Sequence, residues 1–309
     1  MRKFLINLLL FFVPLIVIYI SLEVINRKIP NEYSAKIKNF EDEINNIEVL
    51  VFGSSHALRA VNPEFIDYYT YNMAMVSQTL QLDYAVFEKY KEELKNLKVL
   101  VLTISHFTLS TGLNEGEIAN RISYYHHFYG LPLISRLKVD NYSVLPAIGY
   151  KRATWGFLNY FLKFKVSNVK TNKYGFMGEG GFLAKDSISF VKVGKEAANR
   201  HEDHSYDFNE NIKLLKKMID WSKKHNIKVV LIEVPKTNEY ERNLDQDKAA
   251  LIDSTLDILQ KSNSNVSYFD FTNHYKNKSF FRNADHLNEA GAREFSLLLN
   301  TKISEFIKE

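Results

Sequence analysis

Short apolar runs alternate with amphipathic stretches along most of the chain. Five of these runs have the length and composition of buried strands, at residues 47–52, 68–75, 99–104, 229–234 and 266–271. The stretches 79–96, 211–225 and 246–261 have helical spacing, and a last helix is expected from Glu289 with Asn288 as its N-cap. This alternation predicts an α/β fold with a doubly wound parallel sheet of about five strands.

The alternation lapses between Ser105 and Phe208. A stretch of this length is too long for a plain loop in a compact domain. We therefore expect an insertion at about 105–208, helical at first and loop-like around the glycines at 175–181. It is expected to pack near the strand ends.

The N-terminus carries a long apolar run. From Phe4 to Ile20 only Asn7 and Pro14 interrupt it, and with the residues that follow it reaches roughly the 20 residues of a membrane span. A cleaved signal peptide has a shorter apolar core and an A-x-A-like site, and neither is evident. A core or amphipathic helix fits a uniformly apolar run poorly. The predicted organisation is a transmembrane signal anchor at 1–25, a linker at 26–46 and one α/β domain at 47–309.

Basic residues flank the apolar run on both sides. Arg2 and Lys3 precede it, and Arg27 and Lys28 follow it. A very short basic N-terminus before a large domain favours export of that domain. The predicted localisation is a single-pass protein of the cell membrane with its bulk outside the cytoplasm.

The composition of the chain excludes several classes of protein function. The chain has 309 residues, 46% hydrophobic and 25% charged, which is ordinary for a globular protein that buries a full core. It has no cysteine, so a disulfide framework and a lipidated N-terminal cysteine are both excluded. The net charge of +4 comes without a dense Lys/Arg block, and no glycine-rich nucleotide loop is present. We expect neither nucleic acid nor a cofactor as a ligand.

Two short motifs at opposite ends of the soluble part carry candidate chemistry. Gly53-Ser54-Ser55-His56 follows the first predicted strand, and residues 283–288, Asn-Ala-Asp-His-Leu-Asn, precede the last helix. Both positions fall at the carboxyl edge of a parallel sheet, where ligands bind. A serine and a histidine that meet there can serve as nucleophile and base in acyl chemistry. Ser54 is the alternative nucleophile, and His56 is expected to be a local hydrogen-bond partner.

This motif pair resembles the SGNH (GDSL-like) hydrolase superfamily. It is most similar to membrane-anchored envelope members, such as the protein of D-alanyl teichoic acid transfer and the alginate acetylation proteins. The resemblance covers roughly 47–104 and 211–305 and implies a Rossmann-like (flavodoxin-like) core. It assigns Ser55 as the nucleophile and His286 as the base.

The chain departs from the family pattern in three places. The family's aspartate lies three residues before the histidine, where this chain has Asn283. Asp285 is the nearest acid, and two interpretations stay open: it orients His286, or it caps the helix or pairs with a cation. The glycine of the second family block and the Gly-x-Asn of the third are also missing. The oxyanion and substrate-binding residues expected beside the Ser55 backbone N–H are Gly53, Asn72, Ser77 and Gln78.

Two histidine clusters invite a metal interpretation. They are His126-His127 and His201-Glu202-Asp203-His204. Neither matches His-Glu-x-x-His or a closed zinc spacing, so we predict solvated surface and no metal site.

The sequence thus predicts a membrane-anchored serine O-acyl esterase or acyltransferase that acts on an envelope polysaccharide or another acylated polymer. A multi-spanning membrane acyltransferase is a candidate partner. Because the family carboxylate and oxyanion blocks are altered, the alternative is a non-catalytic scaffold of the same fold that binds polysaccharide or that acyltransferase.

Overall fold

The computed structural model describes residues 1–113, 121–132, 143, 145, 150–162, 169–178 and 187–308. The chain divides into two compact units. The first contains Met1–Ile37 and Asn120–Val169, and the second contains Lys38–Ala119 and Lys170–Glu309. The sheet and every predicted site residue belong to the second unit.

The second unit is built on a five-stranded parallel sheet. Its strands are β1 (Val49–Phe52), β2 (Thr70–Asn72), β3 (Val99–Thr103), β4 (Lys228–Glu233) and β5 (Val266–Asp270). They lie in the order β2-β1-β3-β4-β5, and each neighbouring pair is parallel. This is the flavodoxin-like doubly wound order, which confirms the predicted fold class.

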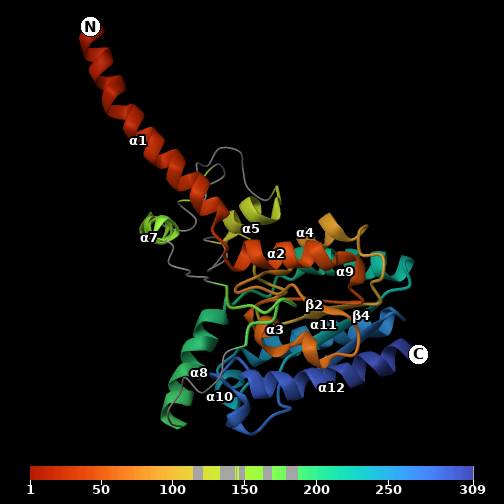
Figure 1. Cartoon of the computed structure of the whole chain (residues 1–309). Helices are drawn as coiled ribbons and strands as arrows, with labels where there is room; N and C mark the ends of the chain where they lie inside the picture. The colour runs from red at the N-terminus through yellow and green to blue at the C-terminus, as the bar shows by residue number, and fades with distance from the viewer. Residues whose placement is uncertain are drawn as a thin grey trace. The chain divides into compact units, whose positions relative to one another are not determined.

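Helices cover both faces of this sheet. Those wholly within the second unit are α3 (Ser55–Ala60), α4 (Leu80–Tyr90), α8 (Ser187–His201), α9 (Asn209–Lys224), α10 (Asn238–Glu241), α11 (Gln246–Ser262) and α12 (Glu289–Lys308). Short 3₁₀ helices form at Ile44–Asn46, Pro63–Phe65 and Lys278–Phe280, and α2 (Glu32–Glu43) runs across the boundary between the units. Helices α4 and α9 pack together over one face of the sheet, and α3 and α12 pack over the other (Figure 1).

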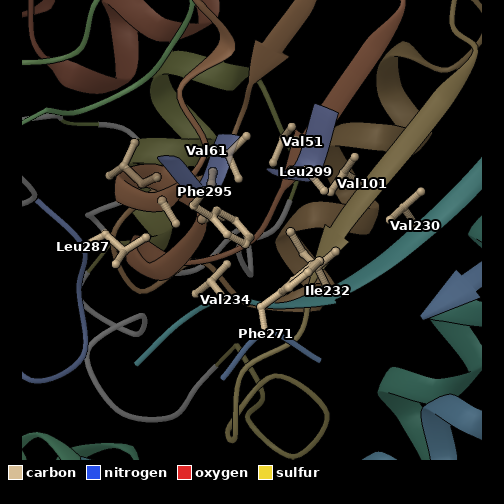
Figure 2. Close-up of a cluster of buried hydrophobic side chains, with 14 of the residues drawn as sticks. Val51, Val61, Val101, Val230, Ile232, Val234, Phe271, Leu287, Phe295 and Leu299 are labelled. Carbon is tan, nitrogen blue, oxygen red and sulfur yellow. The ribbon is translucent and has the colours of Figure 1, made fainter. Parts of the chain in front are cut away.

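The core explains why the central strands read as unbroken apolar runs. All four residues of β1 and all five of β3 are buried, as expected for parallel strands covered on both faces. Val51 and Val101 lie in one buried cluster with Phe295 and Leu299 of α12 (Figure 2). Alternate strand residues therefore anchor α12, which begins at Glu289, three residues after the candidate histidine.

The edge strand β2 is shorter than the predicted run 68–75. The side chain of Asn72 accepts a hydrogen bond from the Ala74 backbone N–H at 3.0 Å, while the Asn72 N–H donates to the Tyr174 carbonyl at 2.9 Å. Past Asn72, backbone hydrogen bonds to the β1 segment continue from the Met73 N–H to the Val51 carbonyl at 2.8 Å and from the Met75 N–H to the Gly53 carbonyl at 3.2 Å. The last helix begins where predicted, and Asn288 caps it by accepting from the Gly291 N–H at 3.0 Å.

The first unit contains α1 (Arg2–Lys28), α5 (Ile122–Tyr129) and α7 (Tyr150–Phe161). Among the described helices, α1 is long and apolar enough to cross a membrane. Its C-terminal end is held by Asn26, whose amide donates to the Ala153 carbonyl of α7 at 3.1 Å. The predicted insertion thus supplies α5 and α7 to the first unit and α8 to the second.

Candidate active site

The candidate nucleophile lies where the sheet topology changes direction. Ser55 begins α3 directly after β1, and β1 pairs with β2 on one side and β3 on the other. Ligands of doubly wound folds bind at the carboxyl edge beside this switch point. Gly53 has φ +139°, and a Cβ at this position would lie 2.9 Å from Cβ of Thr103. A glycine is required here because the chain turns sharply against β3.

The two serines of the motif do different things. Ser54 is buried and is the N-cap of α3, where its hydroxyl accepts from the His56 backbone N–H at 3.3 Å. Ser55 is partly exposed, and its Oγ lies 2.8 Å from Nε2 of His286. The structure therefore brings together Ser55 and His286, which are 231 residues apart in the chain.

Asn283 orients the histidine ring. Its side-chain oxygen accepts from the His286 backbone N–H at 2.9 Å and lies 3.1 Å from the ring Nδ1. If Nδ1 carries the proton that Asn283 accepts, Nε2 presents its lone pair to the Ser55 hydroxyl. That tautomer is the one that a general base needs.

Asp285 supplies a negative charge beside the same ring. Its Oδ1 lies 3.1 Å from Nδ1 of His286, and its side chain is fully buried. Burial favours the neutral acid, but the adjacent His286 and His56 rings outweigh it and hold the pKa of Asp285 well below its usual range. Within the described part of the chain, no donor makes an aligned hydrogen bond to Oδ1. Asn283 therefore supplies the aligned acceptor, while Asp285 supplies the charge.

A second histidine contacts the other oxygen of Asp285. Nε2 of His56 lies 3.4 Å from Oδ2 of Asp285, and its Nδ1 lies 2.7 Å from Oγ of Ser105. The ring is completely buried, and burial lowers its pKa to about 4. His56 is therefore neutral near pH 7, and it links Asp285 to the strand end at Ser105.

The predicted surface position of the 201–204 cluster is wrong for two of its residues. His201 lies 5.4 Å from the His56 ring, centroid to centroid, and its Nδ1 lies 2.8 Å from the buried Tyr240 hydroxyl. Burial lowers the pKa of His201 to about 3. Glu202 contacts Nε2 of the buried His106 at 2.7 Å.

The reason is the close docking of α8 against α10. A Cβ on Gly194 would lie 2.3 Å from the Glu239 carbonyl oxygen, so the two helices approach more closely than any side chain allows. Gly194, Ala197 and Ala198 form one face with helical spacing. That row of small residues was the sequence signal that the end of α8 is packed. Asp203 and His204 are exposed, as predicted.

Most of the predicted oxyanion groups are engaged within the protein. Both amide hydrogens of Asn72 donate to backbone, to Ala57 at 2.9 Å and Val61 at 2.7 Å. The Gln78 amide hydrogen-bonds Asp83, which also accepts from the Gly53 backbone N–H. These bonds brace the loop and leave Asn72 no donor for a substrate.

Two of the expected oxyanion groups remain, the Ser55 backbone N–H and Ser77. The Ser55 backbone N–H is in the first turn of α3, where N–H groups have no acceptor within the helix. Ser77 has φ +59° in the neighbouring loop. The roles of these groups toward an oxyanion stay predictions.

Comparisons with known proteins give a limited result. No family model matches the chain, and no curated protein matches it. A solved structure of a proposed acylhydrolase from Bacteroides fragilis is 11% identical, with a TM-score of 0.45, and the alignment covers 88% of this chain and 98% of that one. A proposed platelet activating factor from Streptococcus pneumoniae is 9% identical, with a TM-score of 0.43 and coverages of 88% and 91%. Neither likeness bears on the chemistry of this chain.

Proposed function

We propose that the protein is a serine O-acyl esterase or acyltransferase with Ser55 as nucleophile and His286 as base. The observation that carries the proposal is the 2.8 Å contact between Oγ of Ser55 and Nε2 of His286, in a ring already oriented by Asn283. The pair sits at the carboxyl edge of the sheet. Both side chains are partly exposed, with 14% of the His286 side chain accessible, so an acyl group can approach.

The reaction proceeds in two steps. Oγ of Ser55 attacks the acyl carbonyl while its proton moves to Nε2 of His286. The tetrahedral intermediate collapses, the C–O bond to the leaving alcohol breaks, and His286 returns the proton to that alcohol. Water or a sugar hydroxyl then attacks the acyl-serine with His286 again as base. Hydrolysis and transfer differ only in this acceptor.

Asp285 has a defined part in these steps. Its charge, 3.1 Å from Nδ1, stabilises the imidazolium that forms when His286 takes the serine proton. The developing oxyanion requires donors near Ser55, and the Ser55 backbone N–H is the proposed donor.

The proposed substrate is an O-acyl group on an envelope polysaccharide or similar polymer. Support comes from the apolar helix α1, which suits a membrane anchor, and from the resemblance of the two motifs to envelope proteins. A multi-spanning membrane acyltransferase is the proposed partner. An anchored domain outside the cytoplasm would meet both.

A fluorophosphonate probe tests the nucleophile. The full chain in detergent micelles should be labelled, because the groups that stabilise a tetrahedral acyl intermediate also stabilise phosphonylation. Labelling should vanish in Ser55→Ala and fall sharply in His286→Ala, while Ser54→Ala keeps most of it. Loss of labelling in Ser54→Ala alone would assign the nucleophile to Ser54 instead of Ser55. A folded wild type without label and without p-nitrophenyl acetate turnover would overturn the proposal in favour of a non-catalytic scaffold.

A further inference from the structure

Three potential metal ligands converge behind the candidate dyad. His56, His201 and Asp285 each offer one ligand atom, and these atoms lie within 4.8 Å of one another. They come from three distant segments, at the start of α3, the end of α8 and the loop before α12. We infer that His56, His201 and Asp285 form a binding site for a zinc-like divalent transition-metal ion.

The spacing of the atoms fits a tetrahedral ion. Nε2 of His56 and Oδ2 of Asp285 are 3.4 Å apart, which is long for a hydrogen bond. Zinc bonds of about 2.0–2.2 Å place neighbouring ligand atoms of a tetrahedral site about 3.4 Å apart. His201 is the third ligand, from the end of α8, and its ligand atom lies within 4.8 Å of the other two. Three protein ligands leave the fourth position for water.

In both histidine rings, Nδ1 already has a hydrogen-bonding partner. Nδ1 of His56 contacts the Ser105 hydroxyl at 2.7 Å, and Nδ1 of His201 contacts the Tyr240 hydroxyl at 2.8 Å. Metal-binding histidines characteristically use their second nitrogen in this way, which fixes the ring and its tautomer. In both residues Nε2 is the nitrogen left for the ion.

Charge and surroundings also suit a cation. Asp285 brings one negative charge, and its Oδ1 has no aligned hydrogen bond from any residue in the described ranges. The nearby cation Lys236 is balanced by Glu233 at 3.8 Å and Glu241 at 3.5 Å. Phe107 packs against both histidine rings, with its centroid 5.8 Å from His56 and 4.8 Å from His201. Imidazole with one carboxylate favours zinc over calcium or magnesium, which prefer oxygen ligands.

Metal binding here would be coupled to the proposed active site, and this consequence rests on the proposed function. Asp285 faces His286 through Oδ1 and His56 through Oδ2. An ion bound to the carboxylate withdraws negative charge from His286. Zinc should therefore slow the labelling of Ser55 by about tenfold or more, and EDTA should restore it.

The test uses the full chain in detergent micelles, stripped of metal by dialysis against EDTA. Co²⁺ serves as a visible probe and Zn²⁺ as its competitor, and bound zinc is counted after equilibrium dialysis. We expect one Zn²⁺ per chain and absorption bands of tetrahedral Co²⁺. His201→Gln should weaken binding by about 100-fold or more, since loss of a direct ligand exceeds the 10–100-fold effect of an outer partner.

His204→Gln is the matched control, because His204 is exposed and lies three residues beyond His201. It should bind zinc as the wild type does. Absence of stoichiometric Zn²⁺ binding by the wild type, or equal weakening in both variants, would overturn the inference. Probe labelling of the metal-free wild type is scored separately, so failure of the metal site is distinct from failure of the serine site.

Discussion

Oδ1 of Asp285 lies 3.1 Å from Nδ1 of His286, although the two residues are adjacent in the chain. Side chains of neighbouring residues usually diverge. Here the Arg282 N–H donates to the His286 carbonyl at 2.9 Å, and Phe281 forms an isolated bridge with Leu287. The loop between them is folded tightly enough to bring acid and ring to the same side.

Asp285→Asn and Asn283→Ala separate the charge beside His286 from its alignment. Replacing Asp285 removes the charge, so turnover of p-nitrophenyl acetate should fall by about 10³–10⁴-fold. Asn283→Ala removes one aligned acceptor, and its loss should be about tenfold. The test compares the p-nitrophenyl acetate turnover of the two variants, after circular dichroism has shown that both are folded. Equal, small losses in both would mean that the site operates as a Ser-His dyad.

Ser54→Ala should affect stability but leave the chemistry intact. Ser54 caps α3, and losing a serine cap costs about 1 kcal/mol. The expected result is a lower Tm with fluorophosphonate labelling close to the wild type. A Tm of Ser54→Ala equal to that of the wild type would contradict the capping role of Ser54.

Asp83 should make stability depend on pH. Burial raises the pKa of its carboxyl to about 7, against about 3.8 in the unfolded chain. The folded protein therefore retains a proton that the unfolded chain loses. This contribution is fully present below about pH 4 and is lost as pH rises through about 7.

The variant Asp83→Asn isolates that effect, since an amide resembles the protonated acid. The Tm of the wild type should fall relative to that of Asp83→Asn between pH 5 and pH 8. The other titrating groups cancel in this comparison. Parallel Tm curves for the two proteins would show that Asp83 is ionised throughout.

Protease digestion tests the predicted membrane orientation. In sealed right-side-out vesicles, external protease should degrade the part of the chain after residue 30 if the domain lies outside the cytoplasm as predicted. Vesicles opened with detergent provide the positive control. Complete protection before opening would place the domain in the cytoplasm.

The strands of the sheet were predictable because the apolar pattern of each strand lies within one short stretch of sequence. Continuous apolar runs such as 99–104 identify buried parallel strands, and Asn288 is a strong cap signal. Strand ends were harder to place, because the backbone at the end of β2 also bonds to the distant Tyr174 carbonyl. Such long-range partners leave no periodic trace in the sequence.

The candidate site was predictable only in its two motifs. Ser55 and His286 follow from the rule that loops at the carboxyl edge of a parallel sheet converge. The contact of His201 with Tyr240 depends on how α8 docks on α10, within a stretch that lacks strand-helix alternation. The engagement of Asn72 with Ala57 and Val61 likewise required the three-dimensional loop path.

The long separation between Ser55 and His286 also affects the order of events during biosynthesis. Ser55 is synthesised 231 residues before His286, and α12 follows that histidine. Contacts between such distant segments form late, after the loops between them have closed. A growing chain therefore carries the proposed nucleophile without its proposed base until α12 docks on the sheet.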